Sequence, residues 1–258
     1  MLLRAEGGGL DIGTLSGRAS VITGGARGLG FAIAELFAEQ GADVAILDLD
    51  GHGAEVAAQR LGGGGMRAVG IQADVGDPGD VERAFGRVAS ELGDVQILVN
   101  NAGMDTTAEI AEMPVEMWDE MIRVNLRSVF LCTRAVLAPM IRNHYGRIIN
   151  ISSQLAHKGA ATMAHYTAAK AGVIGFTRAL AYEVSPHNIL VNAIAPGPLE
   201  TELWRALPEE RRARKLAEIP LGRVGSVEDI APTALLLAGE RCYYQGSTLN
   251  PNGGDVMV

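Results

Sequence analysis

The chain has 258 residues and a mass of 27.1 kDa, of which 48% are hydrophobic and 20% are charged. This length and composition suit one globular domain with a sizeable core and exclude a disordered chain. A formal net charge of −8 argues against nucleic-acid binding, which requires clustered Lys and Arg. The one dense cationic run, at residues 211–215, has glutamates around it and is interpreted as a solvated helix face.

The chain shows no sign of a metal site or of a membrane segment. Cys132 and Cys242 lie far apart, without His or Cys neighbours at metal-ligand spacing. No apolar run approaches the roughly eighteen residues of a membrane span, and the N-terminus lacks a secretory hydrophobic core. We therefore expect a cytoplasmic protein with no metal and no membrane contact. Residues 1–14 contain four glycines and are expected to form a flexible extension before a single domain at residues 15–258.

Short apolar runs rich in Val and Ile alternate with longer segments whose apolar residues recur every three or four positions. This pattern is typical of strand–helix–strand units around a parallel sheet. Strands are expected at Ala19–Thr23, Val44–Asp48, Met66–Ala73, Ile97–Asn100, Ile148–Ser152, Val191–Ala195 and Ser247–Asn250. Helices are expected at Gly28–Glu39, Gly53–Leu61, Pro78–Leu92, Val115–Asn143, Met163–Val184 and Val227–Ala238.

The predicted strands are almost entirely apolar, which indicates that helices cover both faces of the sheet. We therefore predict an α/β fold of the Rossmann type, with a doubly wound, parallel, seven-stranded sheet between helices in a single domain. Residues 196–223 interrupt the rhythm with Pro-Gly-Pro, a tryptophan and a charged helical segment. An excursion of this kind at the carboxyl end of a strand is typical of a lid over an active site.

The first predicted strand runs directly into a glycine-rich turn, Thr23 to Gly30, and then into a helix. Glycines allow a tight turn, and the helix N-terminus can face a pyrophosphate with its free N–H groups. Alone, such a turn is weak evidence, because the glycines can serve only to pack a helix on a strand. It gains weight because an acid, Asp48, ends the second strand about twenty residues later. The sequence therefore predicts a dinucleotide site.

The cofactor preference depends on two charges in this region. The carboxylate of Asp48 can accept hydrogen bonds from ribose hydroxyls and would repel the 2′-phosphate of NADP. Arg27, in the turn, could instead pair with that phosphate. We give Asp48 more weight, because it would oppose the phosphate directly, and predict NAD(H) in preference to NADP(H). The alternative is that Asp48 and Asp50 form only a solvated turn.

Tyr166 and Lys170 are four residues apart in a helical pattern, which places a phenol and an ammonium on one face. A nearby positive charge, which Lys170 and the oxidised nicotinamide can supply, stabilises a phenolate and lowers the tyrosine pKa toward working pH. Tyr166 can then protonate a carbonyl oxygen, or remove an alcohol proton in the reverse direction. Such a pair often arises by chance as a surface Tyr and Lys. Ser153, at the end of a predicted strand, is placed to reach the same carbonyl oxygen.

Together these motifs resemble the short-chain dehydrogenase/reductase family over nearly the whole chain from Leu15 onward. The turn TGGARGLG is similar to the TGxxxGxG motif of that family. The resemblance implies a nicotinamide-dependent oxidoreductase that acts on CH–OH groups, by hydride transfer to a ketone or from a secondary alcohol. The other matching signatures are Asp74-Val75, Asn100-Asn101-Ala102-Gly103, Asn125, Ser153, Tyr166 with Lys170, and Pro196-Gly197.

The resemblance also assigns roles to the matching residues. It implies a catalytic set of Asn125, Ser153, Tyr166 and Lys170, in which Asn125 holds a water between the lysine and solvent. Ser153 is chosen over Ser152 because it precedes Tyr166 by thirteen residues, as in the family. The alternative is that Asn125 is only a polar residue on a helix surface. The cofactor contacts implied are Gly24, Arg27, Gly28, Leu29, Gly30, Asp48, Leu49, Asp74, Val75, Asn101, Ala102, Gly103, Tyr166, Lys170, Pro196, Gly197, Leu199 and Thr201.

Two of these cofactor contacts have a specific expected partner. Asp74 would accept from the adenine amino group, because it follows the third predicted strand. Thr201 would hydrogen-bond the nicotinamide carboxamide, although it also suits a helix N-cap. The substrate pocket is expected to be lined by Ser153, Gln154, Leu155, His157 and Trp204, with Lys158, Met104, Asp105, Leu199 and Leu203 nearby.

The substrate is left open between two classes. The overall sequence, including Pro220 to Arg223 and Asn252 to Gly254, looks like bacterial 3-oxoacyl-acyl-carrier-protein reductases, which implies a 3-oxoacyl thioester. Those reductases usually take NADPH, and Asp48 departs from that pattern. A sugar, polyol or other secondary alcohol therefore stays an equal candidate.

The resemblance also implies a homotetramer, built through the long helices that contain Asn125 and Tyr166 and through the C-terminal strand region. The expected partner is otherwise only a small carbonyl or alcohol substrate. A different class of function is a catalytically silent, NAD(H)-binding regulatory protein of the same fold. The presence of all four residues of the catalytic set disfavours it.

Overall fold

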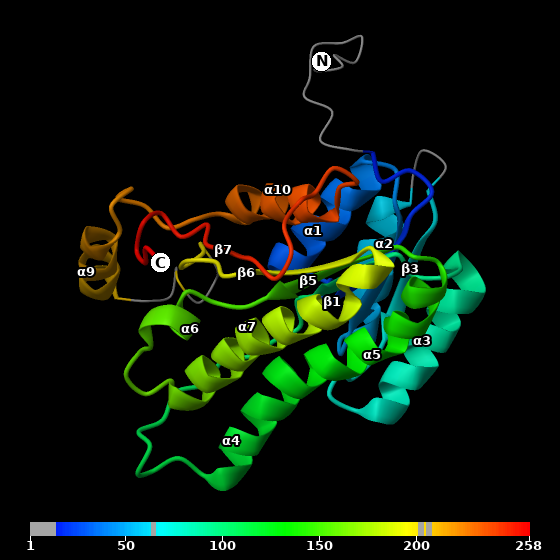
Figure 1. The fold of residues 1–258 in the computed structure, drawn as a ribbon. Coiled ribbons are helices and arrows are strands. Elements are labelled where there is room, and N and C mark those ends of the chain that lie inside the picture. The colour runs from blue at the N-terminus through cyan, green and yellow to red at the C-terminus, as the bar shows by residue number, and fades with distance from the viewer. Residues whose placement is uncertain (1–13, 63–65, 201–203, 205–207) are drawn as a thin grey trace, which may run out of the picture.

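A parallel sheet forms the centre of the molecule, shown in the computed structural model of Figure 1. The structure describes residues 14–62, 66–200, 204 and 208–258. Within them, seven strands follow the order β3-β2-β1-β4-β5-β6-β7, and all pairs are parallel. This is the predicted doubly wound fold. The strands are β1 (Ala19–Thr23), β2 (Asp43–Asp48), β3 (Ala68–Gln72), β4 (Ile97–Asn100), β5 (Gly146–Ile151), β6 (Ile189–Ile194) and β7 (Thr248–Leu249).

Helices cover both faces of the sheet, as the apolar strands predict (Figure 1). Successive strand residues point to opposite faces, so that Val21 belongs to one apolar core and Ile22 to the other. One core lies under α1 (Gly28–Glu39), α2 (Gly51–Leu61) and α10 (Val227–Ala238). The other lies under α3 (Pro78–Leu92), α5 (Ser128–Arg142) and α7 (Ala164–Val184).

The long helix predicted at residues 115–143 is three segments in the structure. Helix α4 (Val115–Ile122) continues into one π-helical turn, η1 (Arg123–Arg127), which leads into α5. Asn125 lies in this turn with its side chain completely buried. Single π turns inside α-helices occur frequently at functional sites, and this one re-aims a polar side chain into the protein.

The same stretch, Val115–Arg142, is long and apolar enough to cross a membrane when only length and composition are counted. In the structure, however, α5 packs against α3 and against strands β4 and β5. Its apolar residues Leu131, Val136 and Met140 are buried in the core under that helix layer. Packing against the sheet therefore accounts for its apolar character.

Three smaller features complete the described part of the chain. A short helix not predicted from the sequence, α6 (Leu155–Lys158), follows β5, and a 3₁₀ turn, η2 (Ser185–His187), precedes β6. The charged segment of the predicted lid forms helix α9 (Glu209–Glu218). Of the predicted N-terminal extension, residues 1–13 lie outside the described residues. The last of its residues, Thr14, donates a hydrogen bond to the carbonyl oxygen of Gln40 (3.3 Å), and Leu15 is fully buried.

Candidate active site

The turn between β1 and α1 brings the backbone close to the end of β4. Gly24 has a φ of +62°, and a Cβ there would lie 2.8 Å from the Cα of Ala102. A Cβ on Gly30 would collide with the carbonyl oxygen of Gly24 and with the amide of Asn101. Gly28 has a φ of +59° and open space where a Cβ would stand, at the first residue of α1. Gly24 and Gly30 therefore let the turn pack tightly against the end of β4, while Gly28 leaves open space at the helix N-terminus, which suits a pyrophosphate.

Asn101 and Thr23 tie this turn to β4. The side-chain amide of Asn101 donates to the carbonyl oxygens of Thr23 (3.0 Å) and Gly24 (2.9 Å). The hydroxyl of Thr23 in turn accepts from the backbone N–H groups of Asn101 and Ala102, both at 3.0 Å. Four hydrogen bonds thus hold the turn against the neighbouring strand, at the point where the strand order reverses between β1 and β4.

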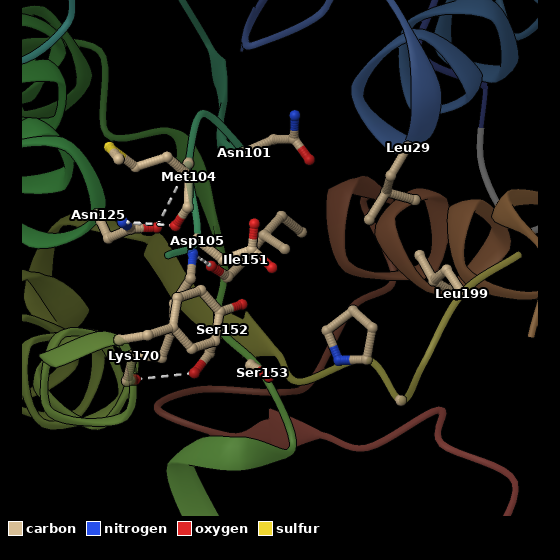
Figure 2. A pocket seen from close by; sticks show the side chains of 14 residues that line it. Leu29, Asn101, Met104, Asp105, Asn125, Ile151, Ser152, Ser153, Lys170 and Leu199 are labelled. Carbon is tan, nitrogen blue, oxygen red and sulfur yellow. Dashed lines mark hydrogen bonds between the residues drawn. The ribbon is translucent and has the colours of Figure 1, made fainter. Parts of the chain in front are cut away.

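Two adjoining hollows lie along the carboxyl ends of the strands, and they share Asn101, Gly103 and Met104. The outer groove is lined by Gly24, Arg27, Leu47, Asp48, Leu49, Ala73, Asp74, Val75, Asn101, Ala102, Gly103, Met104, Glu120, Arg123 and Val124. The inner pocket, drawn in Figure 2, is lined by Leu29, Asn101, Gly103, Met104, Asp105, Asn125, Ile151, Ser152, Ser153, Tyr166, Lys170, Pro196, Gly197 and Leu199.

In the outer groove, the carboxylate of Asp48 is held at the end of β2 by two backbone groups. One oxygen accepts from the N–H of Ala26 at 3.1 Å, and the other accepts from the N–H of Asp50 at 3.0 Å. The side chain of Asp50 caps α2 by accepting from the N–H of Gly53 (2.9 Å). Arg27 lines the same groove but is exposed. Both charges that bear on cofactor preference therefore face one space, with the carboxylate fixed.

Asp74 faces the same groove and is engaged by a neighbouring cation. Both of its oxygens lie 2.9 Å from Nη1 of Arg123, and one also accepts from the N–H of Gly76 (2.9 Å). Arg123 donates to Glu120 at 2.6 and 2.8 Å as well. Burial raises the pKa of Asp74, but the hydrogen bonds from Arg123 and Gly76 outweigh it, so the pKa is lowered. An adenine amino group would share this carboxylate with Arg123.

The inner pocket contains both Tyr166 and Ser153, and the Ser153 side chain acts on the phenol to lower its pKa. Burial raises the pKa of Tyr166; Ser153 lowers it, and the charge of Asp105 raises it further, with a net increase. The hydroxyl of Ser153 also accepts from the backbone N–H of Leu155 at 3.1 Å. The described protein groups therefore keep the phenol protonated at neutral pH and fix the serine beside it.

Lys170 lies one turn after Tyr166 in α7, and its Nζ is 5.8 Å from the centroid of the Tyr166 ring. The ammonium donates to the carbonyl oxygen of Ile151 at 2.9 Å, and burial lowers the pKa of Lys170 to about 8. The i, i+4 placement is thus as predicted. The protein groups alone raise the pKa of Tyr166, because burial is the largest influence on the phenol, and the lowering expected from Lys170 together with the oxidised nicotinamide stays a prediction.

Asn125 reaches the inner pocket from the π turn (Figure 2). Its amide donates to the carbonyl oxygen of Met104 (2.9 Å), and its oxygen accepts from the N–H of Met104 (3.3 Å). A Cβ on Gly103 would lie 2.8 Å from the Asn125 oxygen and 3.4 Å from Nζ of Lys170. The alternative of a polar residue on a helix surface is therefore wrong. Asn125 joins the loop after β4 to the lysine side of the pocket.

Ser152, the alternative to Ser153, is turned to a structural partner. Its hydroxyl donates to the carbonyl oxygen of Lys170 at 2.8 Å, which fastens the end of β5 to α7. Of the two serines, only Ser153 influences the pKa of Tyr166. The choice that the spacing suggested is consistent with this geometry.

Only some of the residues predicted to contact substrate line the inner pocket in the structure. Ser153, Met104, Asp105 and Leu199 line the inner pocket. Gln154, Leu155, His157 and Trp204 are not among the described residues that line it; Gln154 is buried and donates to Asp255. Thr201 and Leu203 lie outside the described residues. The sequence reasoning missed Arg123, whose pairing with Asp74 spans 49 residues and leaves no local pattern, and Glu120, which pairs with Arg123.

Comparisons with known proteins extend over almost the whole chain. A family model described as short chain dehydrogenase matches residues 18–212. The 3-oxoacyl-[acyl-carrier-protein] reductase of Escherichia coli K12 is 41% identical over 243 residues, which cover 94% of this chain and 98% of the relative. The reductases of the same name from Vibrio cholerae and Aquifex aeolicus are 41% and 38% identical, over 95% and 93% of this chain and 99% and 98% of the relatives.

Proposed function

Because this chain belongs to the short-chain dehydrogenase family, we propose that it transfers hydride between NAD(H) and a ketone or secondary alcohol. It is an oxidoreductase that acts on CH–OH or keto groups. The observation that carries the proposal is the inner pocket, where Ser153, Tyr166, Lys170 and Asn125 come together from three different elements. This pocket adjoins the groove that contains the fixed carboxylate of Asp48.

The protein groups supply proton transfer and orientation in this proposal. The nicotinamide, when bound, supplies or accepts the hydride. In reduction, Tyr166 donates its proton to the carbonyl oxygen, since its raised pKa keeps it in the acid form. Ser153 lines the same pocket as the phenol and is placed to orient the same oxygen. Lys170 and Asn125 lie behind the tyrosine, where they can return a proton to it through water.

The preference for NAD(H) rests on Asp48. The backbone N–H groups of Ala26 and Asp50 hold its carboxylate at the end of β2, beside the glycine-rich turn. A second anion placed there, such as the 2′-phosphate of NADP, would meet like-charge repulsion. Arg27 is exposed and would have to leave solvent to compensate.

A 3-oxoacyl thioester is the first substrate class proposed, because the relatives with about 40% identity are named as reductases of such thioesters. A sugar or polyol-type alcohol is the second, favoured by Asp48 and by the carboxylate of Asp105 in the pocket. Carboxylate oxygens accept hydrogen bonds from hydroxyl-rich substrates.

We also propose that the protein is a cytoplasmic homotetramer, as its resemblance to the reductases suggests. The long helices α5 and α7 carry large exposed side chains that suit an interface, Phe130 (46% exposed) and Tyr182 (88% exposed). Light scattering after size exclusion would measure the mass directly. A monomeric mass near 27.1 kDa would contradict this part of the proposal.

The proposed activity is tested by following NADH absorbance with acetoacetyl-coenzyme A, and NAD⁺ reduction with a panel of polyols and secondary alcohols. Turnover that is lost in Tyr166→Phe supports the proposal, and the better substrate class decides between the two candidates. Absence of turnover with either class, together with tight NADH binding, would instead favour a silent, NAD(H)-binding regulatory protein.

A further inference from the structure

A buried carboxylate near the C-terminus lies outside the machinery described above. The side chain of Asp255 is 2% exposed. One oxygen accepts from Nζ of Lys158 at 2.7 Å, and the other accepts from Nζ of Lys215 (2.7 Å) and from the amide of Gln154 (2.5 Å). The C-terminal segment that carries it, red in Figure 1, runs between α9 and α6. One side chain thus receives three donors from two separate parts of the fold.

Two of the donors belong to the segment that carries Ser153. Gln154 is the next residue, and Lys158 ends the short helix α6. The N–H of Gln154 also donates to the carbonyl oxygen of Pro196 at 3.0 Å. This bond joins the segment to Pro196, which follows β6 and lines the inner pocket. A group that holds Gln154 therefore helps to hold Ser153.

The third donor, Lys215, comes from α9, the helix in the predicted lid. The backbone before Asp255 is shaped to approach the end of this helix. Gly253 and Gly254 have φ values of +69° and +88°. A Cβ on them would lie 2.8 Å from Cγ2 of Ile219 and 2.9 Å from Cγ of Pro220, the two residues that follow α9. Only glycine fits this close contact at a left-handed backbone without strain.

The buried carboxylate of Asp255 keeps both of its cationic partners only while α6, with Lys158, and α9, with Lys215, stay in place. Burial raises the pKa of Asp255, but hydrogen bonds from Lys158, Lys215 and Gln154 outweigh it, so the carboxylate stays ionised at neutral pH. Removing one partner of a buried ion pair leaves an uncompensated charge, whereas an exposed pair contributes little. The side chain of Glu218 is 53% exposed, so its ion pair with Lys215 is expected to contribute little.

We propose that Asp255 is a positioning residue that fastens α9 to the segment carrying Ser153 and thereby sets the affinity for substrate. No described residue of α9, α6 or the C-terminal turn lines either hollow, and the junction reaches the inner pocket through Gln154, which follows Ser153 and bonds the carbonyl oxygen of Pro196. Loss of this fastening therefore acts first on substrate binding, because Asp48 and Asp74, which would hold the adenosine end of the cofactor, keep their own partners in the outer groove. The inference rests on the inner pocket as the proposed substrate site, but on neither the substrate class nor the cofactor preference.

Hydrogen–deuterium exchange of the full-length protein tests the fastening without any substrate. In Asp255→Asn, which keeps the shape and removes the charge, amides of residues 209–218 exchange about tenfold faster, while amides of β1 and β4 do not change. Glu218→Gln, which removes only the exposed partner, stays within about twofold of the wild type. Lys215→Met removes the partner in α9 and gives the same increase in the exchange of these amides. It tests the fastening if Asp255→Asn does not fold. Unchanged exchange of α9 in both variants would overturn the proposal.

Kinetics separate positioning from a general loss of structure. With acetoacetyl-coenzyme A as probe, Asp255→Asn raises KM about tenfold, changes kcat less than about threefold and leaves the dissociation constant of NADH unchanged. An equal loss of NADH binding would overturn the positioning role, because it would report damage to the whole fold. If the wild type does not turn over this probe, the proposed thioester substrate fails, while the exchange result still decides the role of Asp255.

Discussion

The inner pocket and the outer groove meet at Asn101 and Gly103, but they hold their polar side chains in different ways. Asn125 and Lys170 are 0% and 4% exposed, and each has a hydrogen-bond partner at 2.9 Å. In the outer groove, Arg27 is exposed, and Asp48 lies at a strand end with only backbone partners. Burial forces a polar side chain to take one geometry, whereas exposed charges compete with solvent and with one another. The geometry of the proposed catalytic residues is therefore more firmly determined than the proposed choice of cofactor.

The largest effect is expected in the inner pocket. Tyr166→Phe removes the only group proposed to exchange a proton with the substrate oxygen and should lower kcat about 10²–10⁴-fold. Steady-state rates measure this loss, and NADH binding should persist. Tyr182→Phe, in the same helix but 88% exposed, is the matched control and should retain wild-type rates. A Tyr166→Phe enzyme with more than about a tenth of wild-type kcat would show that another group moves the proton.

A second substitution tests the fixed charge in the outer groove. Asp48→Ser removes the carboxylate that opposes a 2′-phosphate, so the ratio of NADPH to NADH affinity should rise about tenfold or more, or about 1.4 kcal/mol. Fluorescence titration with both cofactors measures the ratio. Asp43→Asn, at the other end of β2, removes the same charge away from the groove and should not change it. An unchanged ratio in Asp48→Ser would mean that this carboxylate does not select the cofactor.

Arg123 connects the two regions, since it bonds Asp74 in the outer groove and begins the π turn that carries Asn125. Arg123→Met leaves Asp74 without its cation and should weaken NADH binding about two- to fivefold, the range of a partly exposed ion pair. If the π turn depends on this pair, kcat falls as well. A control, Arg83→Met, removes an exposed pair with Asp80 in α3 and should change neither quantity.

The smallest expected effect concerns pH. The negative charge of Asp105 raises the pKa of Tyr166, so Asp105→Asn should lower that pKa. Alcohol oxidation needs the deprotonated phenol, and its rise with pH should therefore begin at lower pH in the variant. The pH profile of kcat/KM shows this shift. Glu109→Gln, in the same loop but outside the pocket lining, should leave the profile in place.

The same contrast explains what could be predicted from the sequence. All seven strands follow from apolar runs, and Tyr166 and Lys170 share a helix face because their spacing requires it. The π turn at Asn125 was not predicted, because one extra residue in a helical turn leaves no periodic signal over so short a stretch. The pair of Asp74 with Arg123 and the junction at Asp255 were missed because partners far apart in sequence meet only in the fold.

The net rise in the Tyr166 pKa that the protein groups cause could not be predicted from the sequence for a related reason. The spacing of Tyr166 and Lys170 predicts their proximity but not their burial, and burial is the larger influence on the phenol. The same burial lowers the pKa of Lys170, which weakens it as a source of positive charge. A motif therefore predicts which groups meet, while their protonation depends on the packing around them.

The most direct test of the proposed function is a fluorescence titration of the purified protein with NADH and with NADPH. If Asp48 selects the cofactor, NADH binds about tenfold more tightly or better, a difference of about 1.4 kcal/mol. Equal or tighter binding of NADPH would contradict the account, because it would show that Arg27 outweighs Asp48.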